Sequence, residues 1–134
     1  MTAKEWLMRG RGIEREIKSL EQSQREAYER LTRATTSLDK ISVRATKDPH
    51  LFDAYVALSD KIQARTAALI GVRVEIIQAT EKLEDANQRT LLIERYVNGK
   101  TWERICVDMK YSWKQVHRIH GAALQAIEPC ISER

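Results

Sequence analysis

Apolar side chains recur at alternating spacings of three and four residues along two long stretches of the chain, and no other feature restricts the fold as strongly. This spacing places them on one face of an α-helix, as in the seam of a coiled coil. The first stretch covers about residues 3–34, and its seam is Trp6, Gly10, Ile13, Ile17, Leu20, Gln24, Ala27 and Leu31. The second runs from about Pro49 or His50 to about Ala86, and its seam is Tyr55, Leu58, Ile62, Arg65, Leu69, Val72, Ile76, Ala79 and Leu83. The pattern therefore predicts two long helices.

Each seam needs a partner, because burying one such apolar side chain contributes roughly 1.5–3 kcal/mol. An antiparallel hairpin of the two helices satisfies both seams in the simplest way. Residues 35–50, which are rich in Thr, Ser and Asp, are predicted to be its connecting loop. Pairing of two hairpins into a homodimer through the long helices is an alternative, since the apolar stripes look wide. We interpret residues 1–86 as a structural stalk or oligomerisation region.

After residue 86 the spacing changes, and short helices with capping signals begin. Asn87 is predicted to cap a helix over residues 88–97, which Asn98-Gly99 ends because Gly tolerates a left-handed backbone. The next two helices have predicted N-caps and ends: Thr101 for Trp102 to about Met109, and Ser112 for Trp113 to about Ile127, with Pro129 as the stop. The predicted fold is all-α: a long, coiled-coil-like helical hairpin over residues 1–86, followed by a trihelical helix-turn-helix unit over residues 87–134.

Charge is distributed unevenly between these two regions. Residues 1–86 carry 15 Lys and Arg against 14 Asp and Glu, whereas residues 87–134 carry 8 against 5. A mild basic excess permits a polyanionic partner without requiring one. Taken alone, the charges of residues 100–120 are equally typical of a solvated helix face.

The combination of a short helix, a tight turn and a second helix with polar positions at its start favours DNA binding. In such units the second helix presents its first residues to base edges, where Arg and Lys donate to guanine and Gln pairs with adenine. Lys110 and the helix start at Thr101 can approach phosphates. The predicted DNA-facing residues are Trp113, Lys114, Gln115, His117 and Arg118, together with Lys110, Thr101 and Ser112.

Other chemistries find little support in the sequence. No nucleophile–base pair, glycine-rich phosphate loop or carboxylate pair stands out, so we do not expect an enzyme or a cofactor. Cys106, His117 and His120 lack a fourth ligand, and the two cysteines have no metal spacing, so a metal site is not predicted. Without a signal peptide or an apolar run of about 18 residues, we expect a cytoplasmic protein with no membrane contact.

The C-terminal region carries a set of residues at spacings that belong to a known pattern: Arg95, Tyr96, Gly99, Thr101, Trp102, Ile105, Met109, Tyr111, Ser112, Val116, Arg118, Ile119, His120, Ala123 and Leu124. In these residues the chain resembles the helix-turn-helix of sigma-factor region four and, more closely, the ArpU/RinA-type phage regulators of late-gene transcription. The resemblance implies a protein of the bacterial host cell that binds double-stranded DNA near a phage late promoter and activates transcription by host RNA polymerase. Trp102 and His120 are expected to pack in the core of the unit.

Two other interpretations stay open at this point. A phage terminase small subunit also joins a helix-turn-helix to a helical oligomerisation region, but it assembles into rings of many copies. A helical protein–protein interaction module would use the trihelical unit to bind another protein and would not bind DNA at low salt. The state of oligomerisation and the salt dependence of DNA binding distinguish the three.

Overall fold

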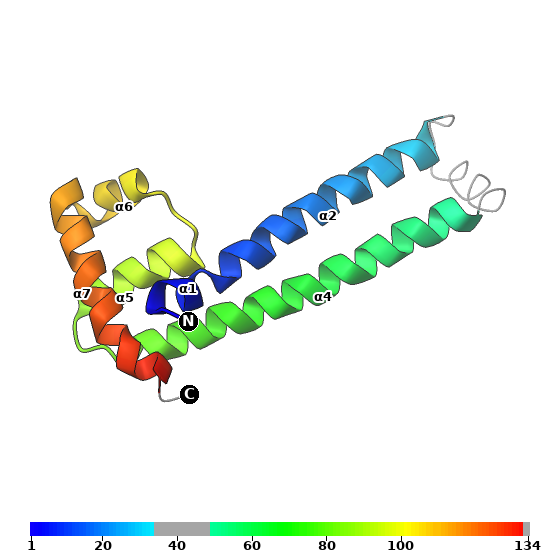
Figure 1. Cartoon of the computed structure of the whole chain (residues 1–134). Helices are drawn as coiled ribbons and strands as arrows, with labels where there is room; N and C mark the ends of the chain where they lie inside the picture. Colours follow the sequence, from blue (N-terminus) through cyan, green and yellow to red (C-terminus); the bar gives the residue numbers. More distant parts are fainter. Residues whose placement is uncertain (34–48, 133–134) are drawn as a thin grey trace. The chain divides into compact units, whose positions relative to one another are not determined.

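The computed structural model describes residues 1–33 and 49–132, and these form helices and turns with no strand (Figure 1). The helices are α1 (Ala3–Leu7), α2 (Arg9–Thr32), α4 (Pro49–Thr80), α5 (Ala86–Leu92), the π-helix η1 (Ile93–Val97), α6 (Trp102–Met109) and α7 (Trp113–Ser132). The all-α prediction is confirmed. Except for Pro49 and His50, which begin α4, the predicted loop over 35–50 lies outside the described residues. The chain divides into two compact units, Ile13–Ala68 and a unit made of Met1–Gly12 with Leu69–Arg134, which we call the hairpin unit and the head unit.

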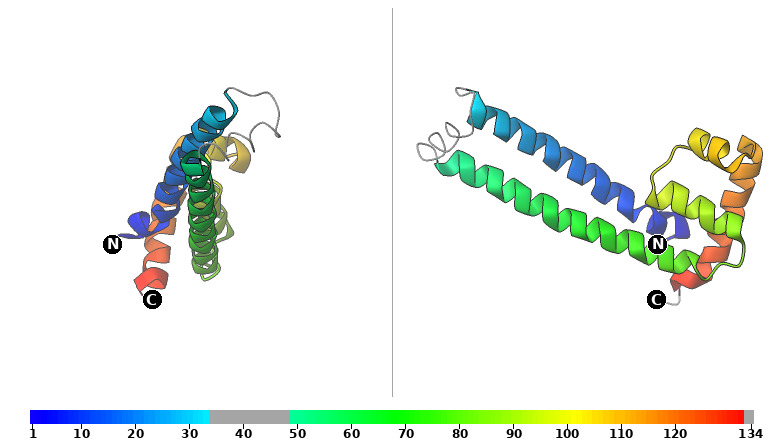
Figure 2. Two further views of the ribbon diagram at one scale, coloured as in Figure 1. Left: turned by 90° about the vertical axis from the view of Figure 1, so that its right-hand side faces the viewer. Right: turned by 180° about the vertical axis from the view of Figure 1, so that it is seen from behind.

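In the hairpin unit, α2 and α4 run antiparallel to each other (Figures 1 and 2). Three contacts show the register. The ring of Tyr28 lies 6.2 Å from that of Tyr55, Gln24 donates a hydrogen bond to Ser59, and Glu16 forms a 2.8 Å ion pair with Arg65. Residue numbers rise along one helix as they fall along the other, so the predicted helical hairpin is confirmed.

The two seams are also confirmed by burial. Every seam position predicted from the sequence is buried or half-buried, and Ile17 and Leu31 are among the most deeply buried in the hairpin unit. The one charged seam residue, Arg65, lies half-buried and uses its guanidinium in the ion pair with Glu16. A charged side chain is tolerated at this position because its aliphatic carbons can pack along the helix while its guanidinium pairs with a carboxylate.

The prediction of one continuous first helix is wrong at Met8, where α1 ends and α2 begins. Thr2 and Glu5 close a reciprocal capping box around the start of α1. At the break, the Arg9 guanidinium donates to the Trp6 carbonyl oxygen at 3.0 Å and lies over the Trp6 ring. The break turns Trp6 and Leu7 into the core of the head unit, a tertiary contact that periodicity along one helix does not reveal.

The second helix ends at Thr80 rather than near Ala86, and Asp85 rather than Asn87 caps the next one. The Asp85 carboxylate accepts from the backbone N–H groups of Asn87 and Gln88 at 2.8 and 3.2 Å. Arg89 holds the intervening turn, since its guanidinium donates to the carbonyl oxygens of Leu83 and Glu84. The cap therefore lies two residues earlier in the chain than predicted.

The head unit has one apolar core, which draws on both ends of the chain. Its buried members are Ala3, Trp6, Leu7, Ile76, Ala79, Leu83, Leu91, Leu92, Tyr96, Ile105, Val116, Ala123 and Ile127. Six of these precede residue 87, so α1 and the end of α4 supply a large part of the core that α5, η1, α6 and α7 share. The boundary between residues 86 and 87 was predicted from periodicity, and as a statement about separate domains it stays a prediction.

The predicted stop of the last helix at Pro129 is wrong, because α7 continues to Ser132. Proline removes one backbone donor from a helix interior and crowds the preceding turn. Here the residues beyond it, Cys130 and Ile131, pack against the core of the head unit. This packing supports the additional turn.

Candidate nucleic-acid interface

Helices α6 and α7 form a helix-turn-helix whose turn is set by one left-handed residue. Lys110 ends α6 with φ 59° and ψ 41°, and the Tyr111 backbone N–H donates to the Cys106 carbonyl oxygen at 3.2 Å. Asn and Gly adopt this conformation most readily, so a lysine here is held by the turn itself. The chain leaves α6 and enters α7 within three residues.

Side-chain caps fix the start of both helices, as predicted. The Thr101 hydroxyl accepts from the Arg104 backbone N–H at 3.2 Å. The Ser112 hydroxyl accepts from the Gln115 backbone N–H at 3.2 Å, and the Gln115 side-chain oxygen accepts from the Ser112 backbone N–H at 3.0 Å. This reciprocal pair is a capping box. It also means that Gln115 already uses its acceptor oxygen.

The two faces of α7 differ sharply in character. Val116, Ala123 and Ile127 are fully buried against the head-unit core. On the opposite face, Lys114 and Arg118 are exposed, with small residues one turn further along. The start of α7 is therefore anchored on one side and presents cationic side chains to solvent on the other.

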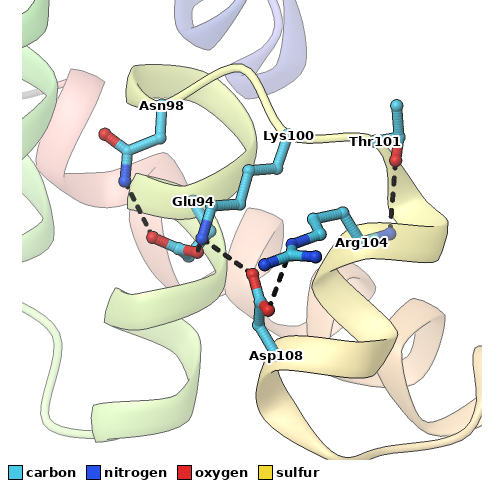
Figure 3. A network of polar contacts seen from close by, with 6 residues as sticks. All are labelled: Glu94, Asn98, Lys100, Thr101, Arg104 and Asp108. Carbon is cyan, nitrogen blue, oxygen red and sulfur yellow. Dashed lines mark hydrogen bonds and ion pairs between the residues drawn. The ribbon is translucent and has the colours of Figure 1, made fainter.

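Part of the basic excess in this region is neutralised by a network that joins η1 to α6 (Figure 3). Lys100 pairs with Glu94 and, at 2.8 Å, with Asp108, which also meets Arg104 at 3.2 Å. The hydrogen bonds that Lys100 donates to the carboxylates of Asp108 and Glu94 raise the pKa of Lys100, and the bond accepted from Lys100 lowers the pKa of Asp108. Lys100 and Arg104 are therefore paired with carboxylates, and the contacts of Lys100 join η1 to α6.

Three cations around the turn are left without such partners. Lys110, Lys114 and Arg118 are exposed, and none of them forms an ion pair within residues 1–33 and 49–132. Lys110 lies in the connection between α6 and α7, and Lys114 and Arg118 lie in the first two helical turns of α7. An exposed cation without a carboxylate partner can exchange its hydration for contact with a phosphate or a base edge.

An aromatic cluster lies beneath this surface. The Trp102 ring lies 4.7 Å from the rings of both His117 and His120, and the Arg95 guanidinium lies over it at 4.5 Å. Trp113 in turn lies 4.4 Å from His117. The His117 ring is thus half-buried between two indoles, and its Nε2 is buried with no hydrogen-bond partner among the described residues.

His120 is the buried member of this cluster and should make the head unit sensitive to acid. Its Nε2 lies 2.7 Å from the Tyr96 hydroxyl, and burial, with the charges of Lys4, His117 and Arg95, lowers its pKa to about 4. The unfolded chain takes up this proton near pH 6.5, so acid favours unfolding across the window from about 6.5 to 4. We expect the free energy of unfolding to fall by roughly 2–3 kcal/mol between these limits.

Urea unfolding at a series of pH values measures this effect. A double variant, Tyr96→Phe with His120→Phe, keeps two rings in the core and removes both polar partners, so its stability should vary less across the same window. Equal pH dependence in the wild type and the double variant would show that another group is responsible.

Comparison with known proteins gives one match. A family model, DUF1492, matches residues 30–128 and is described as a protein of unknown function. The chain belongs to the DUF1492 family. No curated protein and no solved structure matches it. The part of this DUF1492 chain that the model covers begins near the end of α2 and includes α4, α5, η1, α6 and most of α7, so it contains the whole helix-turn-helix.

Most of the predicted DNA-facing residues of this DUF1492 protein lie at the surface. Thr101, Lys110, Ser112, Trp113, Lys114, Gln115 and Arg118 are exposed, whereas His117 is half-buried. The Thr101 and Ser112 hydroxyls are engaged as caps. Trp102 is half-buried and packs against the core, and His120 is 8% exposed, so both pack as expected.

The polar network of Figure 3 was not predicted from the sequence. One of its contacts has a local signal, because Arg104 and Asp108 are four residues apart on one helix. The contacts of Lys100 with Glu94 and Asp108 cross a turn whose path depends on Gly99, which has φ 70°.

In residues 1–33 and 49–132, no three His, Cys, Asp or Glu side chains gather as metal ligands do, and no helix has the length and apolar character of a membrane crossing.

Proposed function

We propose that this protein binds double-stranded DNA through α6, α7 and the turn between them. The single observation that carries the proposal is the set of three exposed cations around the start of a well-anchored second helix, Lys110, Lys114 and Arg118, which have no carboxylate partner among the described residues. In a helix-turn-helix this is the segment that enters the major groove. The chain carries a net charge of +4, which favours approach to a polyanion.

The anchoring beneath these cations supports the same proposal. Caps at Thr101 and Ser112 fix the helix starts, and the stack of Trp102, His117 and Trp113 fixes the first turn of α7. Preorganised side chains lose less conformational entropy on binding.

We further propose that the biological role is activation of phage late genes through host RNA polymerase, in the bacterial cytoplasm. The support is the resemblance to ArpU/RinA-type regulators. Several residues of that resemblance, among them Tyr96, Ile105, Val116 and Ala123, are buried in the head-unit core. They therefore support a shared trihelical fold, and the operator would be determined by the exposed positions of α7.

Exposed apolar residues on α4 support self-association. Phe52 and Val56 are 43% and 41% exposed in the hairpin unit, and Ile70 and Val74 are 55% and 44% exposed in the head unit. A homodimer that covers such residues would present two copies of α7 to two half-sites of DNA. Larger rings would instead favour the second candidate, a terminase small subunit, so light scattering of the purified chain distinguishes the two.

The test of DNA binding is fluorescence anisotropy with a labelled duplex of mixed sequence at increasing salt. We expect the logarithm of the association constant to fall linearly with the logarithm of the salt concentration, with a slope of about −0.9 for each phosphate neutralised. Three cations per chain predict a slope of about −3 per protomer by the same rule. Absence of binding at low salt would instead indicate that the head unit is a protein–protein interaction module.

A further inference from the structure

The exposed side chains at the start of α7 that take no part in the capping box present only hydrogen-bond donors. Lys114 and Arg118 are exposed donors from the first two turns, and Lys110 precedes them in the turn. The ammonium groups and the guanidinium carry no lone pair that could accept, and the exposed indole of Trp113 has only its N–H. The free side chains of this surface therefore donate hydrogen bonds and do not accept them.

The two side-chain acceptors at the start of α7 are engaged in the capping box. The Gln115 side-chain oxygen accepts from the Ser112 backbone N–H, and the Ser112 hydroxyl accepts from the Gln115 backbone N–H. Each oxygen has a second lone pair, but a bidentate contact with adenine needs the amide oxygen and the amide N–H of one side chain aimed together at the base. Gln115 would have to leave the capping box to make that contact.

Packing against aromatic rings keeps the His117 side chain from the surface. Its ring lies between Trp102 and Trp113, and its Nε2 is buried. Reaching a base edge would require the ring to leave both indoles. In the structure, Gln115 and His117 support the first turn, and the base-reading role that the sequence suggested for them is a prediction that the Gln115 variant below tests.

We infer that this surface selects guanine in the major groove, through Lys114 and Arg118 with Lys110 on the adjacent backbone. Guanine presents two acceptors there, N7 and O6, whereas the amino groups of adenine and cytosine require a protein acceptor. A surface whose free side chains are all donors can pair with the N7 and O6 acceptors of guanine, but it leaves the amino groups of adenine and cytosine without an acceptor. This inference rests on the proposed function and specifies the class of DNA that the same site binds.

The experiment selects duplexes with a randomised centre on the full-length chain and sequences those retained. Guanine should be enriched on one strand at the contacted positions. Arg118→Ala or Lys114→Ala should each remove the preference at one position. Gln115→Ala should keep the pattern of preferred bases, with thermal melting showing that the variant is folded at the assay temperature. Replacing a selected guanine by 7-deazaguanine, which lacks the N7 acceptor, should weaken binding about tenfold.

The outcomes separate the inference from the proposal on which it rests. Enrichment of adenine that Gln115→Ala abolishes would overturn the inference and leave DNA binding intact. Retention of DNA with no base preference would also overturn it. If no duplex is retained at low salt, the proposed function itself fails.

Discussion

A fragment of residues 87–134 should remain largely unfolded, with little helical circular dichroism and no cooperative melting. The fragment would lack Ala3, Trp6 and Leu7 from α1 and Ile76, Ala79 and Leu83 from the end of α4, all of which are buried in the head-unit core. Domains of this size are stable by only about 5–15 kcal/mol, and each buried side chain of the size of Val, Leu, Ile or Phe contributes roughly 1.5–3 kcal/mol. The four larger side chains that the fragment lacks would together contribute roughly 6–12 kcal/mol, which is comparable with the whole stability of such a domain.

A point substitution tests the same dependence within the full chain. Leu7 is fully buried, so Leu7→Ala should lower the free energy of unfolding by about 2–5 kcal/mol. Lys4 lies in the same helix but is exposed, and Lys4→Ala should change stability by less than about 0.5 kcal/mol. Denaturant unfolding measures both. Cooperative unfolding of the isolated fragment, or a silent Leu7→Ala, would show that the C-terminal helices fold without α1.

Loss of both unpaired cations of α7 should produce the largest functional effect. The double variant Lys114→Ala with Arg118→Ala removes two donors that are exposed and have no carboxylate partner in the described chain. We expect affinity for duplex DNA to fall by at least about tenfold and the salt slope to decrease by about 2. Helicity should be unchanged, because neither side chain is buried.

Lys61→Ala is the matched control, since Lys61 is an exposed lysine of the hairpin unit on α4. It lowers the net charge by one without touching α7, so it should reduce affinity much less than either α7 substitution. A similar loss in the control would mean that net charge alone governs binding. Wild-type affinity in the double variant would place the DNA contact elsewhere on the protein.

The fold could be predicted from the sequence where one helix face decides the structure. The seams from Ile17 to Leu31 and from Tyr55 to Leu83 repeat regularly, and their burial in the structure agrees with them. The errors occur at helix ends, at Met8, Thr80 and Pro129. There, contacts between distant segments outweigh local propensity, and a single sequence gives no information on such contacts.

The candidate site likewise combines local features, which the sequence predicts, with tertiary contacts, which it does not. Caps at Thr101 and Ser112 are local, so the sequence reveals them. The pairing of Lys100 with Asp108 and the enclosure of His117 between Trp102 and Trp113 depend on how helices pack. Residue type alone therefore identified a basic surface correctly in outline but could not tell which of its polar groups are free.

The participation of α1 in the head unit has a consequence for the order in which the protein matures. Helix α1 has partners in α7, and the Ala3 backbone N–H donates to the carboxylate of Glu128, which is synthesised 125 residues later. At about 5–20 residues per second, this separation corresponds to a delay on the order of ten seconds between the synthesis of Trp6 and Leu7 and the synthesis of those partners. The core beneath the surface that we expect to contact DNA is therefore completed only once α7 has been synthesised, so we expect a chain that still lacks α7 to bind DNA weakly.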